Sequence, residues 1–97
     1  MNNKQVLTSF LEKENAKTNL RNITNGIYQY KGRTLYTQKT NNNDIELINY
    51  STRIAYIKDN NLYINIKKYS STTSKIQTQL KDLASKFNYN IIEYQEN

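Results

Sequence analysis

The 97-residue chain contains no cysteine, no histidine and no proline, and only two glycines. Without cysteine and histidine it has no disulfides, no thiolate nucleophile, no zinc-finger ligand set and no histidine acid–base catalyst. An enzyme would have to rely on tyrosine, lysine and serine alone, so we expect no catalysis, no metal and no cofactor. Since proline is absent, only charged side chains protect the sheet edges from pairing with another chain. The protein is therefore expected to be either a monomer or a homodimer that pairs through a sheet edge.

Long hydrophobic runs are also absent. No segment approaches the length that spans a bilayer and no signal-peptide core is present, so we expect no membrane contact and a cytoplasmic location. Only 36% of the residues are hydrophobic, which predicts one domain over residues 1–97 with its apolar side chains gathered on single faces. The net charge of +6 favours a polyanion or an acidic protein surface as partner, although adenine-rich codons would enrich lysine and asparagine as well.

Two strand-like runs at residues 53–58 and 62–67 flank Asp59-Asn60-Asn61, which predicts a β-hairpin with a tight turn. The turn occupies either residues 59–60 or residues 60–61. In both registers the strand alternation gives the same two faces. The apolar face holds Ala55, Ile57, Leu62, Ile64 and Ile66, and the opposite face holds Tyr56, Lys58, Tyr63, Asn65 and Lys67.

A helix is predicted over residues 72–88, because Ile76, Leu80, Leu83, Ala84 and Phe87 recur at helical spacing. A run of five hydroxyl residues, 70 to 74, spans its start, and we expect the hydroxyl of Ser71 or Thr72 to cap its first turn. A last strand is predicted at residues 89–94. Near the N-terminus, Val6, Leu7, Phe10 and Leu11 form one stripe of a helix over residues 3–15.

Between these parts, residues 27–30 and 33–38 are expected to pair as a second hairpin that turns at Lys31-Gly32, and residues 45–50 to form a further strand. The predicted fold class is therefore α+β: an antiparallel meander of about five strands with the N-terminal and C-terminal helices packed on one face.

Nine tyrosines against two phenylalanines is an unusual ratio for a core, because a buried tyrosine hydroxyl needs a hydrogen-bond partner. Tyrosine interleaved with lysine suits a single-strand stacking platform, and it equally suits a protein-recognition surface. The plainer explanation is that tyrosine simply favours strands. The partner-binding residues we predict are Tyr56, Lys58, Tyr63, Lys67, Lys68 and Tyr69.

A weaker candidate is a phosphate site at the start of the second helix, made by Ser71, Thr72, Thr73 and Lys75. Helix capping explains these hydroxyl groups better, because the glycines of a phosphate loop are missing. Asp44 and Glu46 share a strand face without further ligands nearby, and we expect both to be solvated.

The stretch Tyr69-Ser70-Ser71-Thr72-Thr73-Ser74-Lys75, with the strand pair before it, resembles a group of small bacteriophage proteins of unknown function that carry a Tyr-Ser-x-Thr-Thr-Ser-Lys motif. The likeness covers roughly residues 16–80. The chain departs from the group at Ile76, where such proteins commonly have histidine.

The resemblance implies a phage or mobile-element origin and a role in binding. The function we expect is inhibition of a host defence nucleoprotein machine in the bacterial cytoplasm, as an anti-CRISPR-like protein does. The alternative is direct binding of single-stranded nucleic acid through the same residues, and a third reading is a self-associating structural component.

Overall fold

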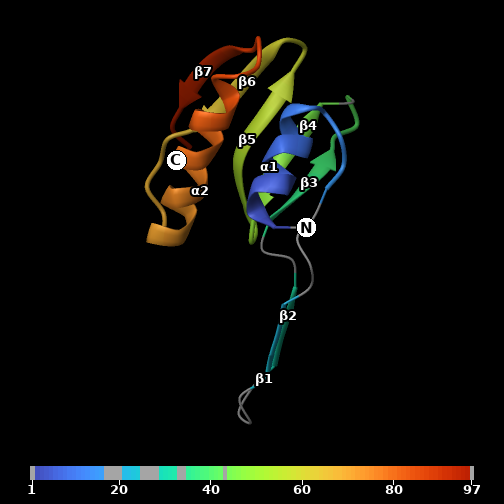
Figure 1. Ribbon diagram of the computed structural model, residues 1–97, viewed down its shortest axis with the longest axis vertical. Coiled ribbons are helices and arrows are strands. Elements are labelled where there is room, and N and C mark those ends of the chain that lie inside the picture. Colours follow the sequence, from blue (N-terminus) through green and yellow to red (C-terminus); the bar gives the residue numbers. More distant parts are fainter. Residues whose placement is uncertain (1, 17–20, 25–28, 33–34, 43, 97) are drawn as a thin grey trace.

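The computed structural model describes residues 2–16, 21–24, 29–32, 35–42 and 44–96 (Figure 1). In chain order its elements are α1 (Asn3–Leu11), β1 (Arg21–Thr24), β2 (Gln29–Gly32), β3 (Leu35–Lys39), β4 (Ile45–Asn49), β5 (Thr52–Lys58), β6 (Asn61–Asn65), α2 (Ser71–Ala84) and β7 (Asn90–Tyr94). The chain is thus α+β, as the hydrophobic patterns predict.

The main sheet has five strands in the order β3-β4-β5-β6-β7. Its first three neighbouring pairs, β3–β4, β4–β5 and β5–β6, are antiparallel. In the central hairpin, Lys58 pairs with Asn61, so the two-residue turn is Asp59-Asn60, with Asp59 in the left-handed region at φ 55°. Aspartate tolerates this conformation better than most residues, which suits it to the turn.

The fifth strand corrects the predicted antiparallel meander, because β7 runs parallel to β6. A tight turn returns the chain antiparallel, whereas a helix between two strands carries the chain back so that the next strand runs in the same direction. The segment between β6 and β7 contains the 14 residues of α2, and the sheet is therefore mixed.

One hydrophobic cluster forms the core. From the sheet it takes Leu35, Ile45, Leu47, Ile54, Ala55, Ile57, Leu62 and Ile64, and from the helices Val6, Leu7, Phe10, Leu11, Ile76, Leu80 and Ala84. The buried side chains of both helices therefore belong to the same cluster as the apolar face predicted for the central hairpin. The exception is Ile66, which lies beyond the end of β6 and is 44% exposed, so its predicted place on that face is wrong.

The first helix is shorter than predicted. Asn2 caps it in a capping box with Gln5, but the helix ends at Leu11 rather than near residue 15. Lys13, at φ 61°, follows the cap; its amide donates to the Phe10 carbonyl, and the Glu14 amide donates to the Ser9 carbonyl. This is the Schellman arrangement, which terminates a helix whatever polar residues follow it.

The second helix spans Ser71–Ala84 instead of residues 72–88, and Ser70 caps it, not Ser71 or Thr72. The Ser70 side chain accepts from the amide of Thr73 at 3.2 Å. We expect Ser70→Ala to lower the free energy of unfolding by about 1 kcal/mol, because one amide of the first turn loses its acceptor. Ser71→Ala is the matched control and should change it little. Urea denaturation of both variants measures the difference, and an equal loss would contradict the assignment of the cap.

The second predicted hairpin is also wrong. β2 pairs with β1, with Arg21 opposite Gly32 and Thr24 opposite Gln29, so Lys31 and Gly32 lie in a strand rather than a turn. β3 joins the main sheet instead. In Figure 1 the β1–β2 pair extends away from the sheet and the helices. The turn predicted at Asn25-Gly26 lies outside the described residues.

Candidate functional site

Three aromatic rings and one guanidinium group meet on the side of the central hairpin away from the apolar face. The rings of Tyr56 and Tyr63 stack with centroids 4.5 Å apart and planes 8° apart. Tyr94, from β7, lies 5.7 Å from Tyr56 at a tilted angle. The guanidinium carbon of Arg53 is 4.4 Å from the centre of the Tyr56 ring, within cation–π range. We call these four residues the tyrosine face.

A β-bulge places Arg53 in this group. The register between β4 and β5 shifts at Leu47 and Ile48, which pair with Ala55 and Arg53, so Ile54 is an extra residue. Ile54 and Ala55 are both buried in the core although they are adjacent in the chain. The bulge thus turns Arg53 to the side of Tyr56, where regular alternation would have placed it with Ala55.

Two carboxylates hold the Arg53 guanidinium. Glu46 of β4 bonds to Nη1 at 3.0 Å, and Glu96, beyond the end of β7, bonds to Nη2 at 3.3 Å. Gln38 donates to the other oxygen of Glu46 at 2.9 Å. The Glu46 side chain is only 15% exposed, so the prediction that it is solvated is wrong.

Asn65 was predicted on the face opposite the apolar one, with Tyr56 and Tyr63, yet it is fully buried. Its Nδ2 donates to the Arg53 carbonyl at 3.2 Å, to the Tyr69 hydroxyl at 2.8 Å and to Glu96 at 3.4 Å. Its Oδ1 accepts from the amide of Lys67 at 3.0 Å. Asn65 therefore fixes the chain after β6 against the start of β5.

The strand directions bring several segments to one end of the sheet. This end, which we call the Arg53 end, consists of residues 50–53, 65–70 and 94–96. Three of the four large apolar or aromatic side chains that are exposed in the described part of the chain belong to it: Tyr50 at 42%, Ile66 at 44% and Tyr69 at 37%. Tyr50 also has a left-handed backbone, at φ 58°. Exposed apolar and aromatic groups therefore lie at the same end of the sheet as the Arg53 ion pairs.

The structure brings the predicted partner-binding residues together only in part. Tyr56 and Tyr63 form the stacked pair, and the Lys67 ammonium lies 5.5 Å from the centre of the Tyr69 ring. Asn65 hydrogen-bonds to the second pair, through the Lys67 amide and the Tyr69 hydroxyl. Lys68 is exposed beside Lys67, whereas Lys58 is exposed next to the Asp59-Asn60 turn at the opposite end of the hairpin.

The residues of the predicted phosphate site do not act as one group. Thr73 is buried and its hydroxyl donates to the side chain of Asn49 at 2.7 Å, which ties the start of α2 to the end of β4. Ser71, Thr72 and Lys75 are exposed. Since Ser70 is the cap, the hydroxyl-rich segment is accounted for by capping and by packing against β4.

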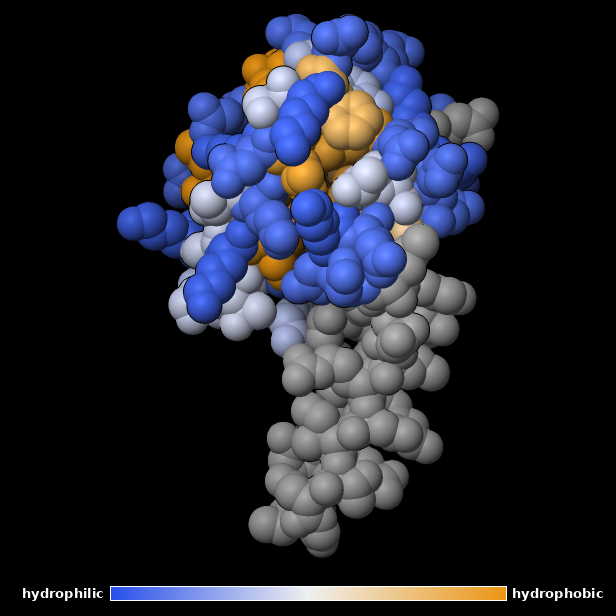
Figure 2. All heavy atoms as spheres, viewed as in Figure 1, coloured by the Kyte–Doolittle hydropathy of each residue, from blue (hydrophilic) through white to orange (hydrophobic). Residues whose placement is uncertain are grey.

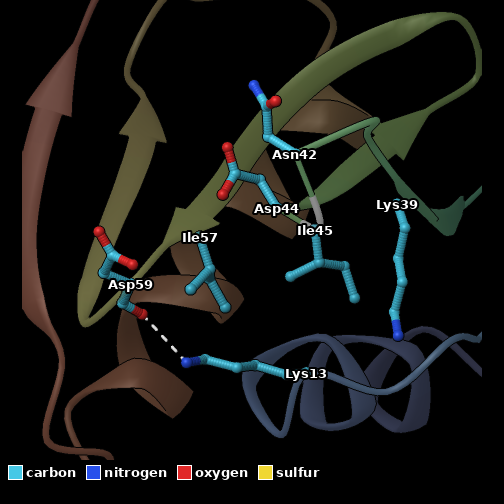
Figure 3. Close-up of a pocket in the computed structure, with 7 residues that line it drawn as sticks. All are labelled: Lys13, Lys39, Asn42, Asp44, Ile45, Ile57 and Asp59. Carbon is cyan, nitrogen blue, oxygen red and sulfur yellow. Dashed lines mark hydrogen bonds between the residues drawn. The ribbon is translucent and has the colours of Figure 1, made fainter.

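A hollow of about 330 Å³ lies at the other end of the sheet, where α1 ends beside the β3–β4 and β5–β6 connections. It is lined by Lys13, Lys39, Asn42, Asp44, Ile45, Ile57 and Asp59. Figure 3 shows the two isoleucines between the carboxylate of Asp44 and the two lysines. The ammonium of Lys13 donates to the backbone carbonyl of Asp59 at 3.0 Å, so this lysine fastens the end of α1 to the hairpin turn. The hollow contains charges of both signs and favours no ligand class.

On the side shown in Figure 2, hydrophilic residues form most of the surface and hydrophobic ones appear between them near the middle of the view.

Within the described residues, no group of three or more acidic, histidine or cysteine side chains is placed to hold a metal ion. No helix of the described part is long and apolar enough to cross a membrane.

Burial raises the pKa of Tyr94 to about 12; the charge of Arg53 acts against this rise and that of Glu96 adds to it. The Tyr94 hydroxyl is buried and has no hydrogen-bond partner among the described residues. An unfolded tyrosine titrates near pH 10, so the unfolded chain releases this proton first as the pH rises. The stability that Tyr94 contributes is thus present below pH 10 and lost between about pH 10 and pH 12.

Burial also raises the pKa of Tyr89, so we expect two tyrosines to ionise after an ordinary phenol in an ultraviolet pH titration, with Tyr94 as the last step, which Tyr94→Phe removes. Tyr36→Phe is the control, and the late step should persist in it. Loss of the late step in the Tyr36 variant, or its persistence in the Tyr94 variant, would contradict the assignment.

Comparison of the chain with protein-family models, with curated proteins and with solved structures finds no match. The molecule is therefore described by its own fold and site: a small α+β protein with a five-stranded mixed sheet and a tyrosine face beside a buried asparagine.

Proposed function

We propose that this protein acts by binding another protein through the tyrosine face and the Arg53 end, without catalysing a reaction. The observation that carries the proposal is the surface composition there: tyrosine, arginine and isoleucine, held by hydrogen bonds on a sheet. Tyrosine and arginine are enriched at protein interfaces and account for much of the binding energy. The proposal assumes that α1 and α2 cover the opposite face of the sheet. Their buried side chains form one cluster with Ala55 and Leu62, which supports this assumption.

The stacking of Tyr56 favours a protein partner over single-stranded nucleic acid. A base needs a free ring face on which to stack. Tyr63 covers one face of Tyr56 at 4.5 Å, a separation that leaves no space for the Arg53 guanidinium between the rings. Arg53 must therefore cover the other face, and Tyr56 has none left for a base.

The charges around Arg53 point the same way. Glu46 and Glu96 both pair with it, so the three groups together carry one net negative charge. Phosphate backbones bind where arginine and lysine are unpaired, because affinity comes from neutralising phosphates. At the Arg53 end, only Lys67 and Lys68 would serve that purpose.

The class of partner in the proposal comes from the resemblance of Tyr69–Lys75 to small phage proteins. On that basis we propose that the partner is a host protein or nucleoprotein complex of bacterial defence, and that binding inhibits it as an anti-CRISPR protein would. Direct nucleic-acid binding through the same residues is the second candidate, supported by the net charge of +6 and by the exposed Lys68.

A capture experiment from bacterial lysate tests the proposal with three forms of the chain. A double variant, Lys67→Ala with Tyr69→Ala, changes the Arg53 end at residues outside the core. Lys86→Ala is the control, because this residue is exposed beyond the end of α2. We expect the wild type and the control to retain one host protein that the double variant releases, and the purified protein to lose its activity when the wild-type chain is added.

Fluorescence anisotropy with single-stranded oligonucleotides at two salt concentrations tests the second candidate. The proposal predicts no binding at physiological salt. Tight binding that falls steeply with salt and is lost in the double variant would replace protein recognition with nucleic-acid binding.

A further inference from the structure

The carboxylate of Glu96 lies in a site made by two donors of the sheet. Its Oε1 accepts from Nη2 of Arg53 at 3.3 Å, and its Oε2 is 3.4 Å from Nδ2 of Asn65. The Glu96 amide also approaches Oδ1 of Asn65, at 3.4 Å. Both oxygens of a single carboxylate thus lie within reach of a donor, although Nδ2 of Asn65 shares its two hydrogens with the Arg53 carbonyl and the Tyr69 hydroxyl. Two contact points of this kind suit a planar anion with two oxygens.

Both donors are held in place by contacts that do not involve Glu96. Glu46 bonds to Nη1 of Arg53 at 3.0 Å, and the ring of Tyr56 lies against the guanidinium. Asn65 is fully buried, and the Lys67 amide and the Arg53 carbonyl fix both ends of its side-chain amide. A site with donors fixed in advance loses little entropy when a ligand enters.

Glu96 itself is held more weakly than Glu46. Its side chain is 41% exposed against 15%, its contacts are longer, and it lies two residues beyond the end of β7. Because Glu46 already neutralises the arginine, the second carboxylate adds an excess negative charge. Of the two acids, Glu96 is therefore the one that an incoming group can replace.

We propose that Glu96 occupies a carboxylate-binding site that serves the protein partner, and that an aspartate or glutamate side chain of this partner displaces Glu96 on binding. The inference rests on the proposed function and specifies the chemistry of the partner: an acidic side chain flanked by apolar groups. Ile66 and Tyr69 at the Arg53 end are exposed and available to those apolar groups.

The experiment uses the full chain and a small probe, N-acetylglutamate N-methylamide, whose only charge is its side-chain carboxylate. Its glutamine counterpart, which is neutral, is the control probe. Glu96→Ala empties the site without touching the core. Glu93→Ala is the matched control, because it removes an exposed acid of β7 that pairs with Lys81 instead. Binding is followed at low salt by NMR, at the side-chain Nε–H of Arg53 and the side-chain amide of Asn65.

In the Glu96 variant we expect saturable shifts of both resonances, with affinity at least five-fold higher than in the wild type or in the Glu93 variant. The wild type binds less well because its own Glu96 competes at a high effective concentration. Equal affinity in all three forms, no binding to the Glu96 variant, or equal shifts from the neutral probe would overturn the inference. Since no partner protein is present, such a failure leaves the capture experiment and the proposed function untouched.

Discussion

Replacing Asn65 with leucine should lower the free energy of unfolding by about 3 kcal/mol, although leucine is apolar and similar in size. Asn65 is fully buried and hydrogen-bonds to the Arg53 carbonyl, the Lys67 amide and the Tyr69 hydroxyl. Leucine leaves these groups without their partner. Each buried polar group that loses its hydrogen bond costs about 1–3 kcal/mol, and the groups nearest the surface recover part of this from water.

Urea denaturation measures the loss, with Asn88→Leu as the matched control. Asn88 is exposed, and its backbone carbonyl accepts a hydrogen bond from the Asn60 side chain. This bond does not use the Asn88 side chain, so replacing that side chain leaves the bond in place. We expect the control to stay within about 0.5 kcal/mol of the wild type. If both variants lose the same amount, Asn65 has no special role in joining β6 to the start of β5.

Much of the main sheet was predictable from local patterns. Period-two alternation at residues 53–58 and 62–67 predicted the hairpin, and Asp59-Asn60-Asn61 located its turn to within one residue. Helical spacing placed Ile76 and Leu80 in the core, where they are 3% and 0% exposed. These successes share a physical origin, because each depends on side chains that are neighbours in the sequence.

The direction of β7 was not predictable in this way. Its sequence specifies a strand but not the neighbour with which it pairs. The parallel pairing goes with the helix between β6 and β7. That helix was predicted, but the strand that β7 joins after it depends on tertiary structure. The pairing of β2 with β1 was missed for a similar reason, since the choice between β1 and β3 depends on where the main sheet ends.

For the candidate site, the sequence identified the stacked tyrosines but missed Arg53, Asn65 and Glu96. Strict alternation put Arg53 on the apolar face, and one signal of the error was present. Ile54 and Ala55 are adjacent apolar residues in a strand that otherwise alternates, as expected of a β-bulge. No such signal marks Glu96, because it reaches Arg53 from 43 residues away.

Tyr63 should be the most sensitive single position for binding the partner. Its ring stacks on Tyr56 of β5 on one side, and half-buried Ile92 of β7 is its register partner on the other, so Tyr63 lies in the middle of this face. A ring already held in one orientation loses little entropy on binding, which is how tyrosine comes to dominate interfaces. We expect Tyr63→Ala to weaken binding of the captured partner by about 30-fold or more, equivalent to about 2 kcal/mol.

Isothermal titration calorimetry with the purified partner measures this change, and Tyr63→Phe separates binding from folding. Phenylalanine keeps the stack on Tyr56, so this variant should bind within a few-fold of the wild type if the ring provides the contact. A large loss in both variants would assign the contact to the Tyr63 hydroxyl instead. Full affinity in the alanine variant, with a folded spectrum, would remove the Tyr63 ring from the interface and contradict the prediction.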